Sequence, residues 1–222
     1  MSFVDDLRKG VGVVFSPQEN ARKGMKVANA LRFYYEFSLL PFIAFIIIGS
    51  LVAHFGISLP SYATILPMLY NPAFSVIAIV ISAIVLFWIL VPIGFFISAA
   101  IYQVVGYNFL HAWKGDFSKT FTAVMFGQLP FVLFYWLMPV PILGELALMV
   151  LAVWSVVVLV IALSSIQMLS RLAAVGVVFV SVALAVIVAM LLFSIMATPF
   201  FALGGSHLLG GYGNSTFVPM MR

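Results

Sequence analysis

The stretch FSLLPFIAFIIIGSLVAH, residues 37–54, begins a run to Trp113 that contains no Asp, Glu, Lys or Arg. Water does not tolerate such a surface, because each exposed apolar methylene forgoes about 0.8 kcal/mol. A helix that crosses a bilayer, by contrast, needs roughly 20 consecutive apolar residues. Further charge-free runs follow at 120–144, 146–170 and 172–221. The sequence therefore predicts an all-α, polytopic membrane protein.

The composition supports the same class. Hydrophobic residues make up 65% of the 222 residues and charged residues 7%, whereas soluble domains average about 45–50% and about 25%. The absence of cysteine excludes disulfides, thiolate metal sites and palmitoylation. The net charge is +4, and most cations precede the first apolar run. Anionic lipid headgroups, rather than nucleic acid, are the expected partners of these cations.

Five transmembrane helices are predicted, at 37–54, 74–102, 120–138, 146–169 and 172–197. Together they form a membrane domain over 37–197. A basic segment, 1–36, precedes this domain, and a glycine-rich tail, 198–222, follows it.

Helix length limits the conformation of two connections between the predicted spans. A helix continuing from Phe74 to Lys114 would be about 60 Å long, so it must kink at Pro92 or Gly106, or project from the membrane. Between the fourth and fifth spans Arg171 is the only charge. A tight hairpin is predicted there, because one uninterrupted helix would exceed any bilayer.

The distribution of basic residues predicts the orientation. With the N-terminus inside, the cytoplasmic segments 1–36 and 103–119 and the turn at Arg171 hold nine of the ten Lys and Arg residues. This satisfies the positive-inside rule, which a four-span or six-span count would violate. We therefore expect a cytoplasmic N-terminus and an external C-terminus, in the cell membrane if the chain is prokaryotic.

The N-terminal segment is predicted to contain an amphipathic helix at the membrane surface. Ser16–Glu19 has the pattern of a capping box with Pro17 at the first helical position. The helix that it would open carries Arg22, Lys23, Lys26 and Arg32 among apolar residues. Such a helix would lie in the headgroup plane. The alternative is a solvated lead-in whose charges only set the orientation.

The sequence carries no pattern typical of an enzyme. His54, His111 and His207 fall at or beyond the ends of spans and share no metal-binding spacing. Neither a nucleophile elbow nor a phosphate-binding glycine loop occurs. We expect no catalytic activity, no metal and no cofactor.

Transport of a small solute is the alternative function. Its candidate site consists of polar residues inside the third and fourth spans, namely Gln128, Ser164, Ser165 and Gln167. Such residues more often hydrogen-bond one helix to another. The acids Glu36, Asp116 and Glu145 are predicted at span boundaries, so no charged relay is expected across the membrane. Small residues at i and i+4 in several spans permit a homo-oligomer or contacts with other membrane proteins.

Several short motifs resemble the Yip-domain family, five-span proteins that interact with Ypt/Rab GTPases. They are Lys114-Gly-Asp-Phe-Ser-Lys-Thr120, the Gln128-Leu-Pro130 of the third span, Trp154, the Leu163–Ala173 turn region and the opening Val14–Pro17. Gly115 stands alone where the family usually has a double glycine, and no long acidic N-terminal extension is present. The resemblance implies a prokaryotic-type scaffold for membrane organisation or trafficking, with a small GTPase as an implied partner.

These arguments give one candidate surface and one candidate modification site. The surface for lipid or partner binding is the cytoplasmic set Arg22, Lys23, Lys26, Arg32, Lys114, Lys119 and Arg171. Asn214, in the triplet Asn-Ser-Thr of the external tail, is a candidate glycosylation acceptor.

Overall fold

The computed structural model describes residues 3–21, 24–54, 80–81, 83–113, 115–140, 142–188 and 190. The chain divides into two compact units, Met1–Phe179 and Val180–Arg222. The last described helix, Arg171–Val188, begins in the first unit and continues into the second. Among the described residues every regular element is helical. Within that part of the chain five helices are long and apolar enough to cross a membrane: Val27–Val52, Val85–Phe109, Phe117–Leu137, Leu143–Gln167 and Arg171–Val188. The predicted all-α, five-span class is confirmed.

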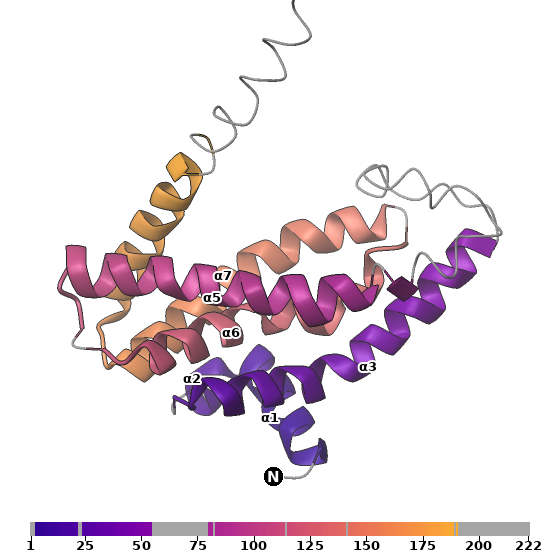
Figure 1. Cartoon of the computed structure of the whole chain (residues 1–222), viewed down its shortest axis with the longest axis horizontal. Coiled ribbons are helices and arrows are strands. Elements are labelled where there is room, and N and C mark those ends of the chain that lie inside the picture. Colours follow the sequence, from indigo (N-terminus) through magenta and orange to yellow (C-terminus); the bar gives the residue numbers. More distant parts are fainter. Residues whose placement is uncertain are drawn as a thin grey trace, which may run out of the picture. The chain divides into compact units, whose positions relative to one another are not determined.

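The third span is the centre of the bundle. It consists of α6 (Phe117–Phe134) and the 3₁₀ turn η5 (Tyr135–Leu137). It contacts α3 (Val27–His54), α5 (Val91–Gln103) and α7 (Leu143–Gln167), and Figure 1 shows α5 running in front of it. In its most apolar stretch 61% of the residues are buried, against 33% for α7. The other spans therefore shield α6 from lipid.

The first span begins earlier than predicted. α3 starts at Val27 rather than at residue 37, and the candidate span Val27–Val52 includes Arg32 and Glu36. These two side chains form an ion pair one helical turn apart, with Arg32 Nε 2.6 Å from Glu36 Oε1. Pairing lowers the cost of charge in an apolar helix. The helix therefore extends ahead of the predicted span, and the position of Glu36 at a span boundary remains a prediction.

The second span, whose kink was left open between Pro92 and Gly106, adjusts at both places. A π-helical turn, η3 (Val85–Leu90), precedes α5, and another, η4 (Val104–Phe109), contains Gly106. The described helix extends past the predicted end at 102, and residues 74–79 lie outside the described part. Helical residues 80–81 and 83–84 precede η3.

Pro92 explains the first of these π-helical turns. Proline has no N–H, so it cannot bond the carbonyl of residue 88 in an α-helix or that of residue 87 in a π-helix. Two tyrosines of α3 supply the missing donors. The Tyr34 hydroxyl donates to the Phe87 carbonyl at 2.5 Å, and the Tyr35 hydroxyl donates to the Trp88 carbonyl at 3.2 Å. The first and second spans are thereby joined at the proline.

The N-terminal segment does not form the predicted continuous helix. It contains α1 (Phe3–Phe15) and a short α2 (Pro17–Asn20), and residues 24–26 are not helical. The capping box is wrong as well, since Ser16 makes no side-chain cap; instead the Asn20 amide donates to the Gly12 and Ser16 carbonyls. In the non-helical stretch 24–26, the Met25 N–H donates to the Thr122 hydroxyl of α6 at 3.0 Å instead of to a helical carbonyl.

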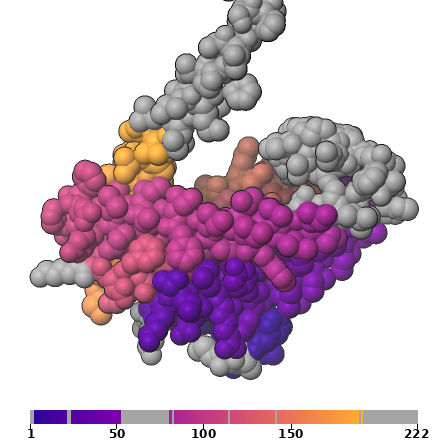
Figure 2. All heavy atoms as spheres, viewed as in Figure 1, coloured from indigo at the N-terminus to yellow at the C-terminus, as the bar shows by residue number. Residues whose placement is uncertain are grey.

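α1 packs against the bundle. It contacts α3 and α6, and its Val13 and Val14 are fully buried. Gly10 lies so close to the Phe37 ring that a β-carbon would overlap it. The Trp154 indole of α7 donates to the Val14 carbonyl at 2.9 Å. Figure 1 shows α1 and α2 beside α3, and in Figure 2 this indigo part of the chain forms one continuous surface with α3. One face of α1 is therefore covered by α3 and α6. The location of this segment in the headgroup plane remains a prediction.

The tight turn predicted at Arg171 is confirmed, and the structure also shows how α6 begins. Asp116 caps α6, accepting the Ser118 N–H at 3.0 Å. α7 ends at Gln167, Met168 adopts a left-handed conformation, and the Leu169 N–H returns to the Ser164 carbonyl at 2.9 Å. The Met168 N–H donates to the same carbonyl, so both residues of the turn close the helix end on Ser164. The next helix begins directly at Arg171, with the Ser170 hydroxyl accepting the Ala173 N–H.

Candidate functional site

Three of the predicted cationic residues gather at one end of the bundle. Gly24 faces the Lys119 side chain and Ile166 of α7, so the strand of chain before α3, the start of α6 and the end of α7 meet there. Lys26, Lys119 and Arg171 are all exposed in this region, which we call the basic end. Arg32 lies farther along α3 and is engaged by Glu36. Arg22, Lys23, Lys114 and Asn214 lie outside the described residues.

A polar recess of about 350 Å³ opens at the basic end. Its lining is Gln18, Ile161, Ser164, Ser165 and Arg171. The recess depends on the hairpin, because the tight turn after α7 places Arg171 back over the last turns of that helix. Among the described residues no carboxylate forms an ion pair with Arg171. A guanidinium beside a serine hydroxyl suits an anionic oxygen; of the two serines, Ser164 donates its hydroxyl to the Ile161 carbonyl at 3.1 Å.

A hydrogen-bonded network holds the basic end in shape. Gln103 is its centre: its Oε1 accepts from Thr120 Oγ1 at 2.6 Å and from Trp113 Nε1 at 3.4 Å, and its Nε2 donates to the Gly115 carbonyl at 3.0 Å. Gln167 of α7 donates to Thr120 Oγ1 at 3.0 Å. The loop between the second and third spans is therefore tied to both α5 and α7.

This network changes the interpretation of Gln167. The sequence placed Gln167 in a candidate solute site, but its amide hydrogen-bonds one helix to another. A role in joining helices is the commoner one for a polar residue inside a span. Gln103, which connects the network, was not singled out, because a lone glutamine near a span end has no distinctive pattern.

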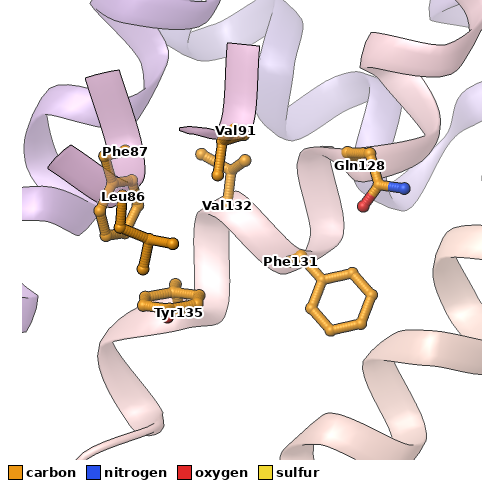
Figure 3. A pocket seen from close by; sticks show the side chains of 7 residues that line it. All are labelled: Leu86, Phe87, Val91, Gln128, Phe131, Val132 and Tyr135. Atoms are coloured by element: carbon orange, nitrogen blue, oxygen red, sulfur yellow. The ribbon is translucent and has the colours of Figure 1, made fainter. Parts of the chain in front are cut away.

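The remaining candidate solute residues lie in two separate places. Ser164 and Ser165 line the polar recess, whereas Gln128 lines a cavity of about 260 Å³ between the second and third spans. The other residues of that cavity are apolar or aromatic: Leu86, Phe87, Val91, Phe131, Val132 and Tyr135. Figure 3 shows Leu86, Phe87 and Tyr135 grouped on one side of Val91 and Val132, and Gln128 and Phe131 on the other.

A second group of charges, missed by the sequence reasoning, lies where α1 meets α3. Asp6 is 5% exposed and lies next to the carboxylate of Glu36, whose Oε1 accepts from Arg32 Nε at 2.6 Å. Burial, followed by the hydrogen bond and the charge of Glu36, raises the pKa of Asp6 above its usual value. Lys9 lies 5.8 Å from the ring centres of both Phe33 and Phe126, within cation–π range. The clue in the sequence is the acidic pair Asp5-Asp6 within the basic segment 1–36.

No protein-family model, curated protein or solved structure matches the chain. The residues themselves therefore carry the functional argument.

Proposed function

We propose that the protein is a non-enzymatic membrane scaffold that binds anionic lipid headgroups at its cytoplasmic face, through the polar recess at the basic end. The single observation that carries the proposal is the recess lined by Arg171, Ser164, Ser165 and Gln18. A planar guanidinium binds a phosphate through two parallel hydrogen bonds. The Ser165 hydroxyl can donate to a remaining phosphate oxygen, whereas the Ser164 hydroxyl donates to the Ile161 carbonyl at 3.1 Å and would have to rotate to do so.

The surroundings of the recess support the same ligand. Lys26 and Lys119 are exposed at the basic end, and each cation near an anionic membrane surface contributes about 1 kcal/mol. Because the recess lies where α7 ends, its depth matches the level at which lipid phosphates lie. The resemblance to Yip-domain proteins is consistent with a scaffold, and a small GTPase partner is part of this proposal only through that resemblance.

The test is lipid binding by the full chain purified in a neutral detergent. Dioctanoylphosphatidylglycerol is the anionic probe and dioctanoylphosphatidylcholine the zwitterionic one, titrated at low and high salt. We expect preference for the anionic probe, a loss of about tenfold in affinity for Arg171→Gln, and a smaller loss for the Ser164→Ala, Ser165→Ala double variant. These magnitudes follow from charge-assisted bonds of about 1.5–3 kcal/mol and about 1.4 kcal/mol per tenfold.

Arg32→Gln provides the matched control, since it removes one cation that already has a carboxylate partner. It should leave the binding of both probes unchanged. Equal affinity for the two lipids in the wild-type protein would reject the proposal. Equal losses in Arg171→Gln and Arg32→Gln would also reject it, because the charges would then act through overall potential rather than through the recess.

A further inference from the structure

The cavity between the second and third spans is lined by apolar and aromatic side chains, with the Gln128 amide and the Tyr135 hydroxyl as the polar groups of its lining residues. One side comes from the π-helical turn η3 and the start of α5, through Leu86, Phe87 and Val91. The other side comes from α6 and η5, through Gln128, Phe131, Val132 and Tyr135, as Figure 3 shows. No charged residue lines it. An ion or a charged solute would therefore lose its hydration without compensation.

Gln128 is the unusual member of this wall. Its amide has no hydrogen-bond partner among the described residues, although the neighbouring polar side chains of α6, Thr120 and Thr122, are bonded. An amide in a membrane span that finds no partner costs free energy, because lipid tails offer none. In this respect Gln128 differs from Gln103 and Gln167, whose amides are satisfied by the network.

The depth of Gln128 restricts what could bond it. The residue lies eleven positions after Phe117 and nine before Leu137, the ends of the third span. At about 1.5 Å per residue, it is roughly 16 Å from one end and roughly 14 Å from the other. A phospholipid keeps its charged headgroup at the interface and cannot bring it to this level. A neutral lipid has no such constraint.

We propose that this cavity binds a neutral lipid whose carbonyl or hydroxyl group hydrogen-bonds the Gln128 amide. Phe131, less than one turn from Gln128 along α6, lies beside the polar end, and the apolar part of the lipid contacts Leu86, Val91, Val132 and the packed rings of Phe87 and Tyr135. The amide both donates and accepts, so it pairs with either group. The volume of about 260 Å³ holds part of such a molecule, and the rest extends into the bilayer. This site is separate from the polar recess and does not depend on the proposed function.

The experiment measures retention of a neutral lipid by the full chain in detergent, using native mass spectrometry. Dioctanoylglycerol is the probe, and hexadecane is the apolar control that offers no hydrogen bond. We expect Gln128→Leu to weaken dioctanoylglycerol binding about fivefold, the factor that corresponds to one neutral hydrogen bond. The same variant should leave hexadecane binding unchanged, because leucine keeps the cavity open and apolar.

Two further variants test the location. Val132→Trp and Leu86→Trp each fill the cavity from a different helix, so the result does not depend on one variant folding; either should abolish binding of both probes. Val153→Trp is the control, because Val153 is 68% exposed on α7 and outside the cavity. Equal binding of dioctanoylglycerol by wild type and Gln128→Leu would overturn the proposal. Binding that survives in a folded filling variant, or no wild-type binding of dioctanoylglycerol, would overturn it as well.

Discussion

α6 and α7 are adjacent helices of similar predicted role, yet they differ in how sequence relates to environment. α7 is the more apolar of the two but the less buried, whereas α6 carries Thr120, Thr122 and Gly127 in its buried face. In a soluble bundle the most apolar helix would be the most buried. In a membrane the lipid is as apolar as leucine, so hydropathy indicates exposure to lipid, and small or polar residues indicate helix contact.

Truncating a buried side chain of α6 should have the largest effect. Leu129 is fully buried, and Leu129→Ala leaves a cavity that should cost about 2–5 kcal/mol of stability. Val153→Ala on the exposed face of α7 should change stability by less than about 0.5 kcal/mol. Unfolding of both variants in mixed micelles with increasing sodium dodecyl sulfate measures the difference. Equal losses would contradict the central position of α6.

A methyl group at the contact between α6 and α7 should have the next largest effect. A β-carbon at Gly127 would lie 2.7 Å from Leu159 Cβ, and 3.1 Å from Leu159 Cα. Gly127→Ala should therefore destabilise by about 1–3 kcal/mol, since the two helices must separate. Gly94→Ala in α5 is the matched control, because no atom lies within 4 Å of its added β-carbon. It should be neutral or stabilise by up to about 1 kcal/mol through helix propensity. Thermal denaturation in detergent compares the two, and an unchanged midpoint in Gly127→Ala would refute the close approach.

Trp154 tests whether the exposed helix α7 also has a specific contact. Trp154→Phe keeps a ring but removes the indole donor to the Val14 carbonyl. We expect a loss of about 0.5–1.5 kcal/mol and faster hydrogen–deuterium exchange in α1, with exchange in α6 unchanged. Trp88→Phe is the control, since Trp88 contributes its backbone carbonyl to the described hydrogen bonds. Unaltered exchange in α1 would mean that Trp154 does not hold it.

The smallest expected effect is a dependence of α1 docking on pH. The pKa of Asp6 is raised in the folded protein by burial and by Glu36, so the docked state binds the proton more tightly than the released state. Its contribution to docking is complete below the ordinary aspartate pKa and is lost as the pH rises through the raised value. Labelling of a cysteine introduced at Val13 should therefore increase from acid to neutral pH. Asp6→Asn should remove that dependence, and a dependence that persists would assign it to another group.

Local signals were sufficient for the parts of the fold that depend on neighbouring residues. The third and fourth spans and the hairpin at Arg171 could be predicted because each rests on hydropathy or on a turn within a few residues. Only part of the candidate site could be predicted from the sequence. Ser164, Ser165 and Arg171 were named for different reasons, and their common recess, completed by Gln18 of α2, depends on the packing of α2 against α7.

By itself the sequence determined the class of the protein: an all-α chain with five helices long and apolar enough to span a membrane. The physical reason is that lipid imposes length and apolarity on every span separately. Only the tertiary structure decided which span is central, where α1 docks and how Tyr34 and Tyr35 donate to the carbonyls near Pro92. It also decided that the amides of Gln103 and Gln167 are hydrogen-bonded, whereas that of Gln128 has no hydrogen-bond partner among the described residues. These outcomes depend on which side chains of distant segments meet, and apolar helices in an apolar solvent carry little local information about their partners.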